Sequence, residues 1–425
     1  MSFPRYPKYK DSGVEWLGEV PEHWGVDRFK TSVQTCRNGI WGAEVQGNAD
    51  DVPCVRVADF DRQRLRVGLD IPTIRNVTAS ERDGRILSRG DLLLEKSGGG
   101  ESQPVGCVML YEDDAAAICS NFVARVQLAA GMVPSFWRYA HAAAYTVRLN
   151  TRSIKQTSGI QNLDQQQYLD ERAAFPPSAE QAAIASFLDR ETAKIDALIA
   201  EQQRLVGLLD EQLKALALCA FNAPSTVMVR LGAATDVISR PLLGESGTTY
   251  TRLGLYNRGR GIFHKDPSEP EEMGDSDFFW VEEGDLILSG QFAWEGAVAI
   301  AGPEESRCVV SHRYPIVRGK AGILRTEFLF ALLCTAHGDF LLNENSRGAA
   351  GRNRPLNIGS LLKEKVPVPD IRLQDKAAQI YHQRQGLLKE VEIQQALLQE
   401  RRSALISAAV TGQIDVRGLA GSEAA

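Results

Sequence analysis

The stretch GDLLLEKSGGGES, residues 90–102, has a counterpart later in the chain, GDLILSGQFAWEG at 284–296. In each, a Gly-Asp step leads into an apolar run that is typical of a buried strand, and a loop of small and polar residues follows. The two Gly-Asp steps lie 284 − 90 = 194 residues apart. A local pattern repeated at so long a spacing predicts that the chain folds as two copies of one unit.

The same spacing recurs in other features of the two halves. Ser120 lies in ICSNFVARVQ and Ser311 in VVSHRYPIVRG, at an offset of 311 − 120 = 191 residues. A stretch with the pattern of a short helix follows each, at 136–144 and at 328–336. A polar loop, a proline pair and a long helical stretch then follow in both halves. Offsets of about 191 to 195 residues over most of each half predict an internal duplication of roughly 190 residues.

Each half ends in a long helical stretch, expected at about 178–220 and 373–410. Apolar residues recur there every seven positions, which is typical of the seam of a coiled coil. The predicted seam consists of Leu188, Ile195, Leu209 and Leu216 with Gln202 in the gap, of Leu198 and Leu205 on the complementary series, and of Ile380, Leu387, Val391, Leu398 and Leu405 in the second helix. Both seams lie at equivalent places in the repeat, so we expect them to pair, with Gln202 helping to fix the register. The alternative is that each helix packs only on its own globular unit.

Length and composition limit the class of protein. The chain has 425 residues, enough for two or three domains. Its formal net charge of −6 gives no overall indication of nucleic-acid binding, so any such role must come from local basic patches. Its seven cysteines include no C-x-x-C pair, which argues against a disulfide framework or a zinc knuckle and fits a reducing compartment. The N-terminal segment lacks the apolar core of a signal peptide, and no membrane span is supported. We therefore expect a cytoplasmic protein.

These patterns predict an α+β fold: two similar mixed α/β domains in a pseudo-two-fold arrangement, separated by a long antiparallel two-helix coiled coil. Such a chain would carry two similar binding modules, related by an approximate two-fold axis, within one polypeptide. A ligand that suits this arrangement is duplex DNA, where two modules can dock in successive major grooves about 34–36 Å apart. Because the halves are similar but not identical, the two half-sites need not match.

Four stretches resemble a known family. They are YPKYKDSGVEWLGEVPEHWGVDRF (6–29), FPPSAEQAAIASFLDRETAKIDALI (175–199), its diverged counterpart PVPDIRLQDKAAQI (367–380), and the closing LISAAVTGQIDVRG (405–418). All four are similar to segments of the DNA specificity subunits of type I restriction-modification systems. The resemblance covers the whole chain and implies a DNA-binding subunit with two target-recognition domains.

The resemblance also gives expected boundaries and partners. The expected segments are an N-terminal arm at 1–23, target-recognition domain 1 at 24–177, a central helix at 178–222, target-recognition domain 2 at 223–370, and a C-terminal helix and tail at 371–425. The helices would bind two methyltransferase (M) subunits, which carry S-adenosylmethionine for adenine methylation. The complex would then recruit nuclease-translocase (R) subunits that use ATP and Mg. No cofactor, metal, small-molecule substrate or membrane is implied for the chain itself.

Because recognition domains diverge within the family, candidate DNA contacts must come from residue chemistry. Arginine and lysine neutralise phosphate, arginine also reads guanine edges, and side-chain amides read adenine. In the first half the candidates are Lys96, Ser97 and Gln103 on the glycine-rich tip, and Arg148, Arg152, Lys155, Gln156 and Gln161 in the polar loop that follows the short helix. The alternatives are an ordinary flexible hairpin for the tip and a solvated surface loop for the second segment.

In the second half the candidates form four groups. They are Arg258 and Arg260 in TRLGLYNRGRGIFHK, Gln291 on the second tip, the cluster His312, Arg313 and Tyr314, and Arg347, Arg352, Asn353 and Arg354 in the loop 341–358. Trp294 on the second tip would either stack on a base or close the local core. The segment 266–285 carries nine acids and no base, so we expect it to lie away from DNA as a solvated face, or to contact a basic partner.

The chain is not expected to be an enzyme. A DNA methyltransferase needs an Asn/Asp-Pro-Pro-Tyr/Phe motif, which is absent, and a P-loop needs glycines before its lysine, whereas those of EKSGGG follow Lys96. The runner-up hypothesis is a coiled-coil scaffold whose globular units bind proteins. A third hypothesis is that DNA binding appears only once the methyltransferases have assembled.

Overall fold

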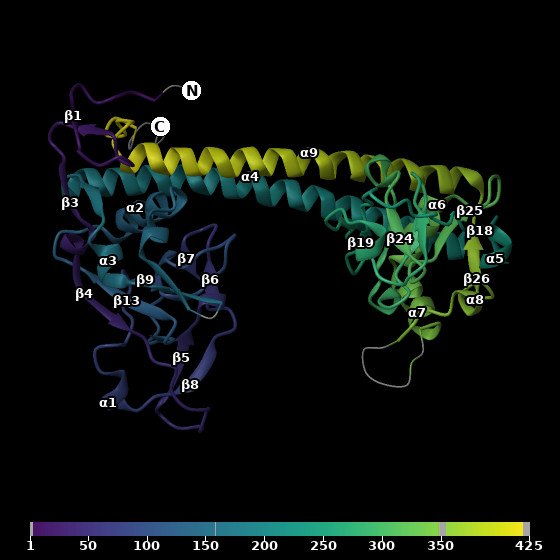
Figure 1. The fold of residues 1–425 in the computed structure, drawn as a ribbon, viewed down its shortest axis with the longest axis horizontal. Coiled ribbons are helices and arrows are strands. Elements are labelled where there is room, and N and C mark those ends of the chain that lie inside the picture. The colour runs from purple at the N-terminus through teal and green to yellow at the C-terminus, as the bar shows by residue number, and fades with distance from the viewer. Residues whose placement is uncertain (1–2, 158, 347, 349–353, 420–425) are drawn as a thin grey trace. The chain divides into compact units, whose positions relative to one another are not determined.

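The computed structural model describes residues 3–157, 159–346, 348 and 354–419. The chain divides into two compact units (Figure 1). Unit 1 runs up to Ile199 and resumes at Gln395, and unit 2 is Ala200–Gln394. Each unit therefore contains one half of α4 (Ser178–Cys219) and one half of α9 (Ile371–Val410), close to the expected ends of the long helices.

The centre of unit 1 is a six-stranded sheet. Its strand order is β4 (Val33–Asn38), β13 (Val123–Leu128), β9 (Leu92–Glu95), β11 (Val108–Leu110), β7 (Arg66–Val67) and β6 (Phe60–Asp61). The apolar run of the first quoted stretch is β9, whose three leucines are fully buried because the strand is covered on both faces. One face packs on α2 (Pro134–Thr146), which lies between the sheet and α4 (Figure 1).

Smaller elements surround this sheet. They are the sheet of β12 (Ile118–Cys119), β5 (Asp51–Val55) and β8 (Thr73–Asn76), the sheet of β10 (Ser97–Gly98), β15 (Ile160–Leu163) and β14 (Ile154–Thr157), the pairs β1 (Tyr9–Asp11) with β2 (Glu19–Pro21) and β16 (Arg172–Phe175) with β3 (Gly25–Arg28), and the helices α1 (Ala79–Arg82) and α3 (Gln165–Leu169).

Unit 2 repeats the central part of this sheet. Its four-stranded sheet has the order β18 (Thr235–Ile238), β25 (Ile316–Gly319), β22 (Leu286–Leu288) and β23 (Val298–Ile300). These strands correspond in chain order to β4, β13, β9 and β11, and in both units neighbours among these four strands are antiparallel. The prediction of two similar mixed α/β domains is confirmed.

The other elements of unit 2 are shorter. They are the pairs β17 (Val227–Arg230) with β26 (Lys365–Val368), β19 (Leu253–Leu255) with β20 (Ile262–His264) and β21 (Phe278–Trp280) with β24 (Val309–Ser311), and the helices α5 (Leu231–Ala234), α6 (Thr326–Leu333), α7 (Ala336–Glu344) and α8 (Ile358–Leu361). The helix expected at 328–336 ends early at Leu333. Thr335 then caps α7 by accepting a hydrogen bond from Gly338 N through its hydroxyl at 3.2 Å, so a second helix begins there.

The halves of α4 and α9 pack antiparallel in each unit. In unit 1, Arg402 of α9 donates to Asp196 of α4 at 2.7 Å, and both side chains are largely buried. In unit 2, Arg384 bonds Asp210, and Gln202 donates its amide to Gln394. Gln202 therefore bonds across the helix pair, in line with its predicted role in setting the register.

Most of the predicted seam is buried or half-buried, but the series of Leu198 and Leu205 was wrong. The seam residues that are buried or half-buried are Leu188, Ile195, Gln202, Leu209, Leu216, Ile380, Leu387, Val391, Leu398 and Leu405. Leu198 and Leu205 are instead 55% and 44% exposed. The complementary series lies one residue later, with Ile199 buried in unit 1 and Leu213 in unit 2. A shift of one residue turns a helical side chain by about 100°, which moves it out of the contact.

A buried glutamine fixes the start of each long helix in the same way. In unit 1, Gln181 accepts from Val133 N at 3.0 Å and donates to Pro176 O at 2.9 Å. In unit 2, Gln374 accepts from Arg325 N at 2.7 Å and donates to Pro369 O at 2.9 Å. The duplication thus extends to single hydrogen bonds, which tie the helix to the proline before it and to the segment that precedes α2 or α6.

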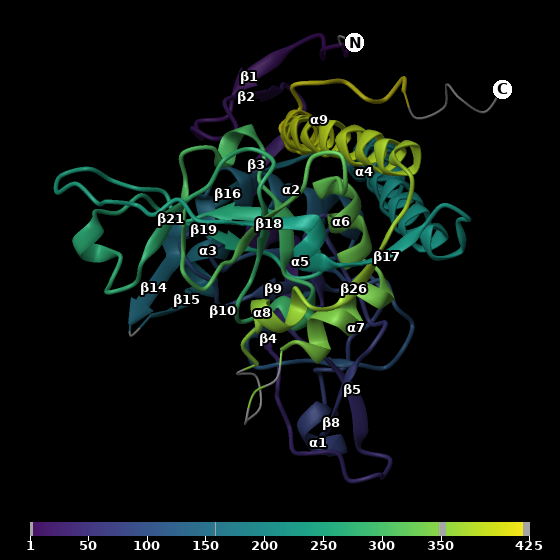
Figure 2. The ribbon, with the colours of Figure 1, turned by 90° about the vertical axis from the view of Figure 1, so that its right-hand side faces the viewer.

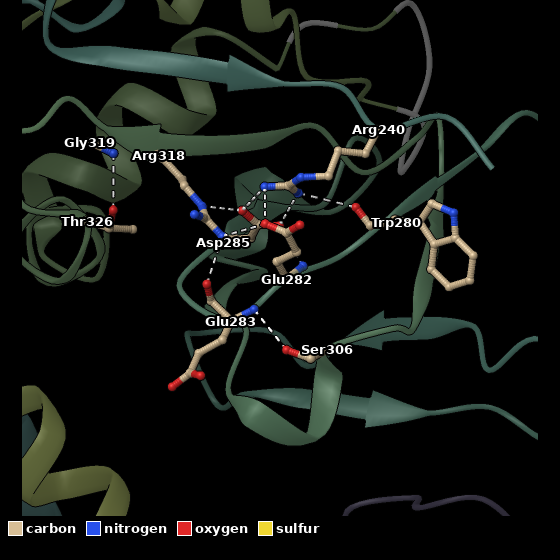
Figure 3. Close-up of polar contacts among 9 residues, drawn as sticks. All are labelled: Arg240, Trp280, Glu282, Glu283, Asp285, Ser306, Arg318, Gly319 and Thr326. Atoms are coloured by element: carbon tan, nitrogen blue, oxygen red, sulfur yellow. Dashed lines mark hydrogen bonds and ion pairs between the residues drawn. The ribbon is translucent and has the colours of Figure 1, made fainter.

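The aspartate of each Gly-Asp step is a second repeated contact. Asp285 is fully buried; its carboxylate accepts from Arg318 Nε at 2.5 Å, Arg240 Nη1 at 2.8 Å and Glu282 N at 2.9 Å (Figure 3). The hydrogen bond to Asp285 raises the pKa of the Arg240 guanidinium. The contact ties the start of β22 to the neighbouring strand β25.

In unit 1, Asp91 likewise accepts from Arg125 Nε at 2.6 Å and from Ser88 N at 2.7 Å. Arg125 lies on β13, the equivalent of β25. The same side-chain contact therefore joins the start of the central strand to its neighbour in both units.

Replacing Asp285 by Ala should destabilise unit 2 by about 3 kcal/mol, because it leaves two guanidinium groups without their buried carboxylate. Urea unfolding followed by circular dichroism measures this loss. Asp275→Ala removes an exposed acid of the same segment and is the matched control. Equal stabilities of the two variants would contradict a structural role for the Asp285 contact.

Unit 1 should also lose stability in acid through His141. This residue is fully buried in α2, stacks on Phe29 at 4.4 Å between ring centroids, and places Nδ1 2.8 Å from the Tyr168 hydroxyl. Burial lowers the pKa of His141 to about 3. Because this pKa lies below the unfolded value of about 6.5, the unfolded chain takes up the proton first as the pH falls, and stability is lost below about pH 6.5.

The expected loss from this histidine between pH 7 and pH 5 is about 2 kcal/mol. The His141→Gln variant keeps a polar group but does not titrate, so its unfolding free energy should depend less steeply on pH. His312→Gln, at an exposed site, is the control and should follow the unmodified chain. A pH dependence unchanged in His141→Gln would show that this site does not link protonation to folding.

Candidate nucleic-acid interface

The first glycine-rich tip is a fixed turn. Gly98 and Gly99 adopt left-handed backbone angles, φ 118° and 61°, which favour glycine. A Cβ on Gly99 would lie 2.7 Å from Val105 N, and Gly100 N donates to Gln103 O at 3.0 Å. The chain therefore folds back on itself between residues 98 and 105, as the glycines permit. The flexible-hairpin alternative stays open.

The first tip and the polar loop, which were predicted separately, form one surface in unit 1. Strands β10, β15 and β14 lie side by side as an antiparallel sheet (Figure 2). Leu163 N donates to Lys96 O at 2.8 Å, and Ser97 Oγ donates to Asn162 Oδ1 at 2.6 Å. Asn150 donates its amide to Val105 O at 2.6 Å, which ties the end of the tip to the same loop.

The candidate residues of unit 1 fall into two groups. Those exposed to solvent are Gln103, Arg148, Arg152, Lys155 and Gln156, while Lys96 is half-buried and Ser97 and Gln161 are buried. Ser97 bonds Asn162 as described, and Gln161 Oε1 accepts from Val105 N at 3.2 Å. Both buried side chains thus hold the surface in shape, which leaves the exposed group as the candidate DNA contacts.

The exposed cations of unit 1 already have partners. Arg148, itself in a left-handed conformation, donates to Ser102 O at 3.3 Å. Arg152 lies 3.8 Å from a Glu15 carboxylate oxygen, and Lys155 lies 2.7 Å from Asp164. The hydrogen bond from Lys155 lowers the pKa of Asp164, which also caps α3. Gln103 and Gln156 make no side-chain hydrogen bond among the described residues.

The second tip, residues 289–296, gathers three arginine-bearing segments of unit 2. Gly290 N donates to Arg313 O at 2.6 Å, and Leu356 N, two residues after Arg354, donates to Gly290 O at 2.8 Å. On the other side of the tip, Arg258 N donates to Glu295 O at 3.0 Å. Three of the four predicted groups are therefore hydrogen-bonded to the fourth, the tip itself.

The candidate residues of unit 2 differ in accessibility. Arg258, Arg260, Gln291, His312 and Arg313 are exposed, and Tyr314 and Arg354 are half-buried. Tyr314 packs against the core formed by Leu253, Val310 and Ile316, and burial raises its pKa, so it has a structural role. Arg347, Arg352 and Asn353 lie outside the described residues.

A cavity of about 950 Å³ opens beside the second tip. Its lining includes Arg258, Arg260, Trp294 and Lys214 of α4, together with two acids, Glu295 and Asp339. Trp294 is half-buried and has the Arg354 guanidinium above its ring, 5.2 Å from the centroid. Cationic and aromatic side chains thus line one cavity. Cations can pair with the phosphates of a nucleic acid, and aromatic rings can stack on its bases.

The sequence interpretation missed several of these positions. Tyr256, whose ring lies under Arg260, belongs to the segment TRLGLYNRGRGIFHK (251–265). The sequence analysis considered only the charged residues of this segment. Lys214 belongs to the long helix and was not considered with the patch. Asn162, an exposed neighbour of the first tip, was passed over within a segment chosen for its glutamines and cations. Strand pairing, which the sequence alone did not predict, brings Asn162 beside Ser97.

The acidic segment is not one uniform solvated face. Eight of its nine acids are exposed, at 266, 269, 271, 272, 275, 277, 282 and 283, whereas Asp285 is the buried carboxylate of Figure 3. The segment surrounds a small cluster that includes Tyr250, Met273 and Val309. That this segment lies away from DNA stays a prediction.

Comparisons with known proteins identify the fold. No family model matches the chain, and no curated protein matches it. One solved structure, from work on the complex assembly and conformational transition of the type I R-M system, is 16% identical with a TM-score of 0.51, and the match covers 92% of this chain and 98% of that one. The chain shares its fold with this structure of the type I R-M system.

Two further structures are similar over most of both chains. The HsdS subunit from Thermoanaerobacter tengcongensis is 17% identical, with a TM-score of 0.42 and coverage of 93% of this chain and 98% of that one. The S subunit of a type I restriction-modification system from M. genitalium is 15% identical, with a TM-score of 0.47 and coverage of 91% and 96%. None of the helices among the described residues has the length and apolar composition of a membrane span, and all seven cysteines are free thiols.

A close backbone contact makes Gly290 a sensitive position in the second tip. A Cβ at this residue would lie 2.3 Å from Arg313 O, a backbone atom that cannot move aside alone. Gly290→Ala should therefore displace the tip, destabilise unit 2 by about 1–3 kcal/mol, and weaken duplex binding by the assembled complex. Fluorescence anisotropy with labelled DNA measures the binding. Gly386→Ala, where nothing lies within 4 Å, is the control; equal affinities of the two variants would exclude the second tip from the interface.

Proposed function

We propose that the chain is the non-catalytic DNA-specificity subunit of a type I restriction-modification complex. The observation that carries this proposal is the repetition of one α/β unit, each copy of which gathers its exposed polar and cationic residues on the tip that follows the Gly-Asp strand. In this proposal each tip reads one half-site of a bipartite duplex sequence. The fold shared with the type I R-M structure supports the assignment.

The two tips differ, so the proposed target is asymmetric. The first tip exposes the amides of Gln103 and Gln156 beside cations that are engaged with neighbouring groups. The segments hydrogen-bonded to the second tip expose Arg258, Arg260 and Arg313. Amides and guanidinium groups prefer different base edges, so the two half-sites should differ in sequence.

The long helices would set the distance between half-sites and bind two methyltransferase subunits. Apolar side chains remain exposed on the helix halves of both units, with Leu198 at 55% and Leu397 at 58% in unit 1, and Leu205 at 44%, Leu208 at 47% and Ile393 at 64% in unit 2. Exposed leucines and isoleucines along a helix suit contact with helices of a partner. This support is independent of the tips.

The chemistry would belong to the partners. The methyltransferase subunits, which carry S-adenosylmethionine, would methylate adenine within the sequence that this chain selects. The nuclease-translocase subunits, with ATP and Mg, would cleave DNA. Among the described residues, no three His, Cys, Asp or Glu side chains are placed to hold a metal ion.

Mapping methylated adenines in a host that expresses the chain with its methyltransferase tests the proposal. We expect a gapped motif with two unlike halves. Exchanging residues 24–175 for the matching segment of a relative should change one half of the motif and leave the other half and the gap unchanged, because each unit reads its half-site through its own tip.

The reciprocal exchange of residues 223–370 is the control and should change only the other half. A change of both halves by either exchange would exclude independent reading by the two units. The absence of any motif, or duplex binding that ignores sequence, would favour a scaffold that binds proteins. Assaying the chain with and without its methyltransferase separates this result from DNA binding that appears only after assembly.

A further inference from the structure

The arginines at the second tip are not engaged by acids. Elsewhere in unit 2, Arg240 and Arg318 bond the buried Asp285, and Arg384 bonds Asp210. By contrast, Arg260 and Arg354 form no ion pair among the described residues, although both lie at a surface built by the tip. Their guanidinium groups are therefore available to a ligand.

Each of these two arginines stacks on an aromatic ring. The Arg260 guanidinium carbon lies 5.6 Å from the centroid of Tyr256, and Arg260 Nε donates to Asn257 O at 3.0 Å. The Arg354 guanidinium carbon lies 5.2 Å from the centroid of Trp294. Stacking fixes the plane of a guanidinium, and the bond through Nε leaves the two terminal amino groups of Arg260 free. Such a group is a pre-oriented pair of hydrogen-bond donors.

Guanine matches such a pair best among the four bases. Its major-groove edge presents two adjacent acceptors, O6 and N7, whereas adenine presents one acceptor and one donor. The two arginines also share one location, since Arg260 and Trp294 both line the cavity of about 950 Å³ beside the tip. Glu295 and Asp339 also line this cavity, but among the described residues neither carboxylate is paired with Arg260 or Arg354, and Glu295 accepts from the Asn257 amide. The site thus presents paired donors that no carboxylate occupies.

The first tip has no counterpart of this arrangement. Within its described residues, 96–105 and 148–163 without 158, no arginine lies over an aromatic ring. Arg148 donates to Ser102 O, and Arg152 faces Glu15 at 3.8 Å. The two tips therefore differ in the groups they offer a ligand: arginines stacked on aromatic rings occur at the second tip and not among these residues of the first.

We propose that Arg260 and Arg354 make unit 2 select guanine, each by donating two hydrogen bonds to O6 and N7 in the major groove. This inference rests on the proposed function and adds the base that unit 2 requires. Tyr256 and Trp294 act as positioning residues, because they hold the two guanidinium planes. The competing assignment is that both arginines only clamp phosphates, which also accept paired hydrogen bonds.

Replacement by lysine separates the two assignments. Lysine keeps the charge that a phosphate contact needs but loses the planar fork that reads guanine. In the complex with its methyltransferase, Arg260→Lys and Arg354→Lys should each relax a G·C position in one half of the methylated motif. The preference for G·C there should fall about 5- to 100-fold, and the other half-site should be unchanged, which also shows that the variants fold.

Arg372→Lys, at an exposed position of α9 in the same unit, is the matched control and should leave the motif as it is. A motif in which both variants keep every G·C requirement would assign the two arginines to phosphate and overturn the inference. Relaxation at an A·T position would overturn it as well. If the unmodified complex has no motif at all, the proposed function itself fails.

A second measurement does not depend on any variant. Duplexes in which 7-deazaguanine replaces the guanines of one half-site lack N7 but keep the backbone. The unmodified complex should bind the duplex altered in the half-site of unit 2 about tenfold more weakly than the unaltered duplex, since one hydrogen bond of each pair is lost. Equal affinity for the two duplexes would overturn the inference even if the lysine variants lose methylation altogether.

Discussion

The fold of each unit depends on a buried carboxylate at the start of its central strand. Asp91 and Asp285 accept hydrogen bonds from an arginine of the adjacent strand, Arg125 in unit 1 and Arg318 in unit 2. Ionised groups in a protein interior are costly unless they are paired, so this contact strongly limits how the strands can align. The far end of the same strand leads into the tip. The buried aspartate–arginine pair thus fixes one end of the strand, and the tip lies at the other end.

The two units share a framework, which consists of the central sheet with its aspartate–arginine pair and the start of the long helix. They differ in the tips that follow the central strand. Gln181 and Gln374 make the same pair of hydrogen bonds at the start of the long helices. The tips are built differently: a small three-stranded sheet supports the first, whereas backbone bonds from arginine-bearing segments support the second. A duplicated framework with two unlike tips fits the proposed function, in which one chain binds two unlike half-sites.

Much of the framework could be predicted from the sequence. The Gly-Asp repeat predicts the equivalent strands β9 and β22, and heptads predict both long helices, because buried strands and helix seams leave periodic apolar patterns. The error at Leu198 and Leu205 has a simple origin. The series one residue later, Ile199, Val206 and Leu213, is also apolar, so the heptad pattern alone does not decide between the two, and only the structure shows which series is buried.

The candidate site was harder to predict, since it depends on contacts between distant segments. Residue type alone placed Ser97 and Gln161 among the DNA contacts, but both are buried by strand pairing and serve the shape of the tip. The basic patches were found by charge, yet their gathering at Gly290 and Glu295 rests on backbone hydrogen bonds that leave no sequence signal. The stacking of Arg260 on Tyr256 follows from the local turn and is likewise visible only in the structure.

The division of the chain between the units has a consequence for its synthesis on the ribosome. Unit 2 is one continuous segment, Ala200–Gln394, whereas the core of unit 1 includes Leu405, Ile406 and Val410 from the end of α9. Unit 1 must therefore wait during translation, with part of its apolar surface uncovered, until the end of α9 has been made. Unit 2 can fold before that, and the end of α9 then completes the core of unit 1.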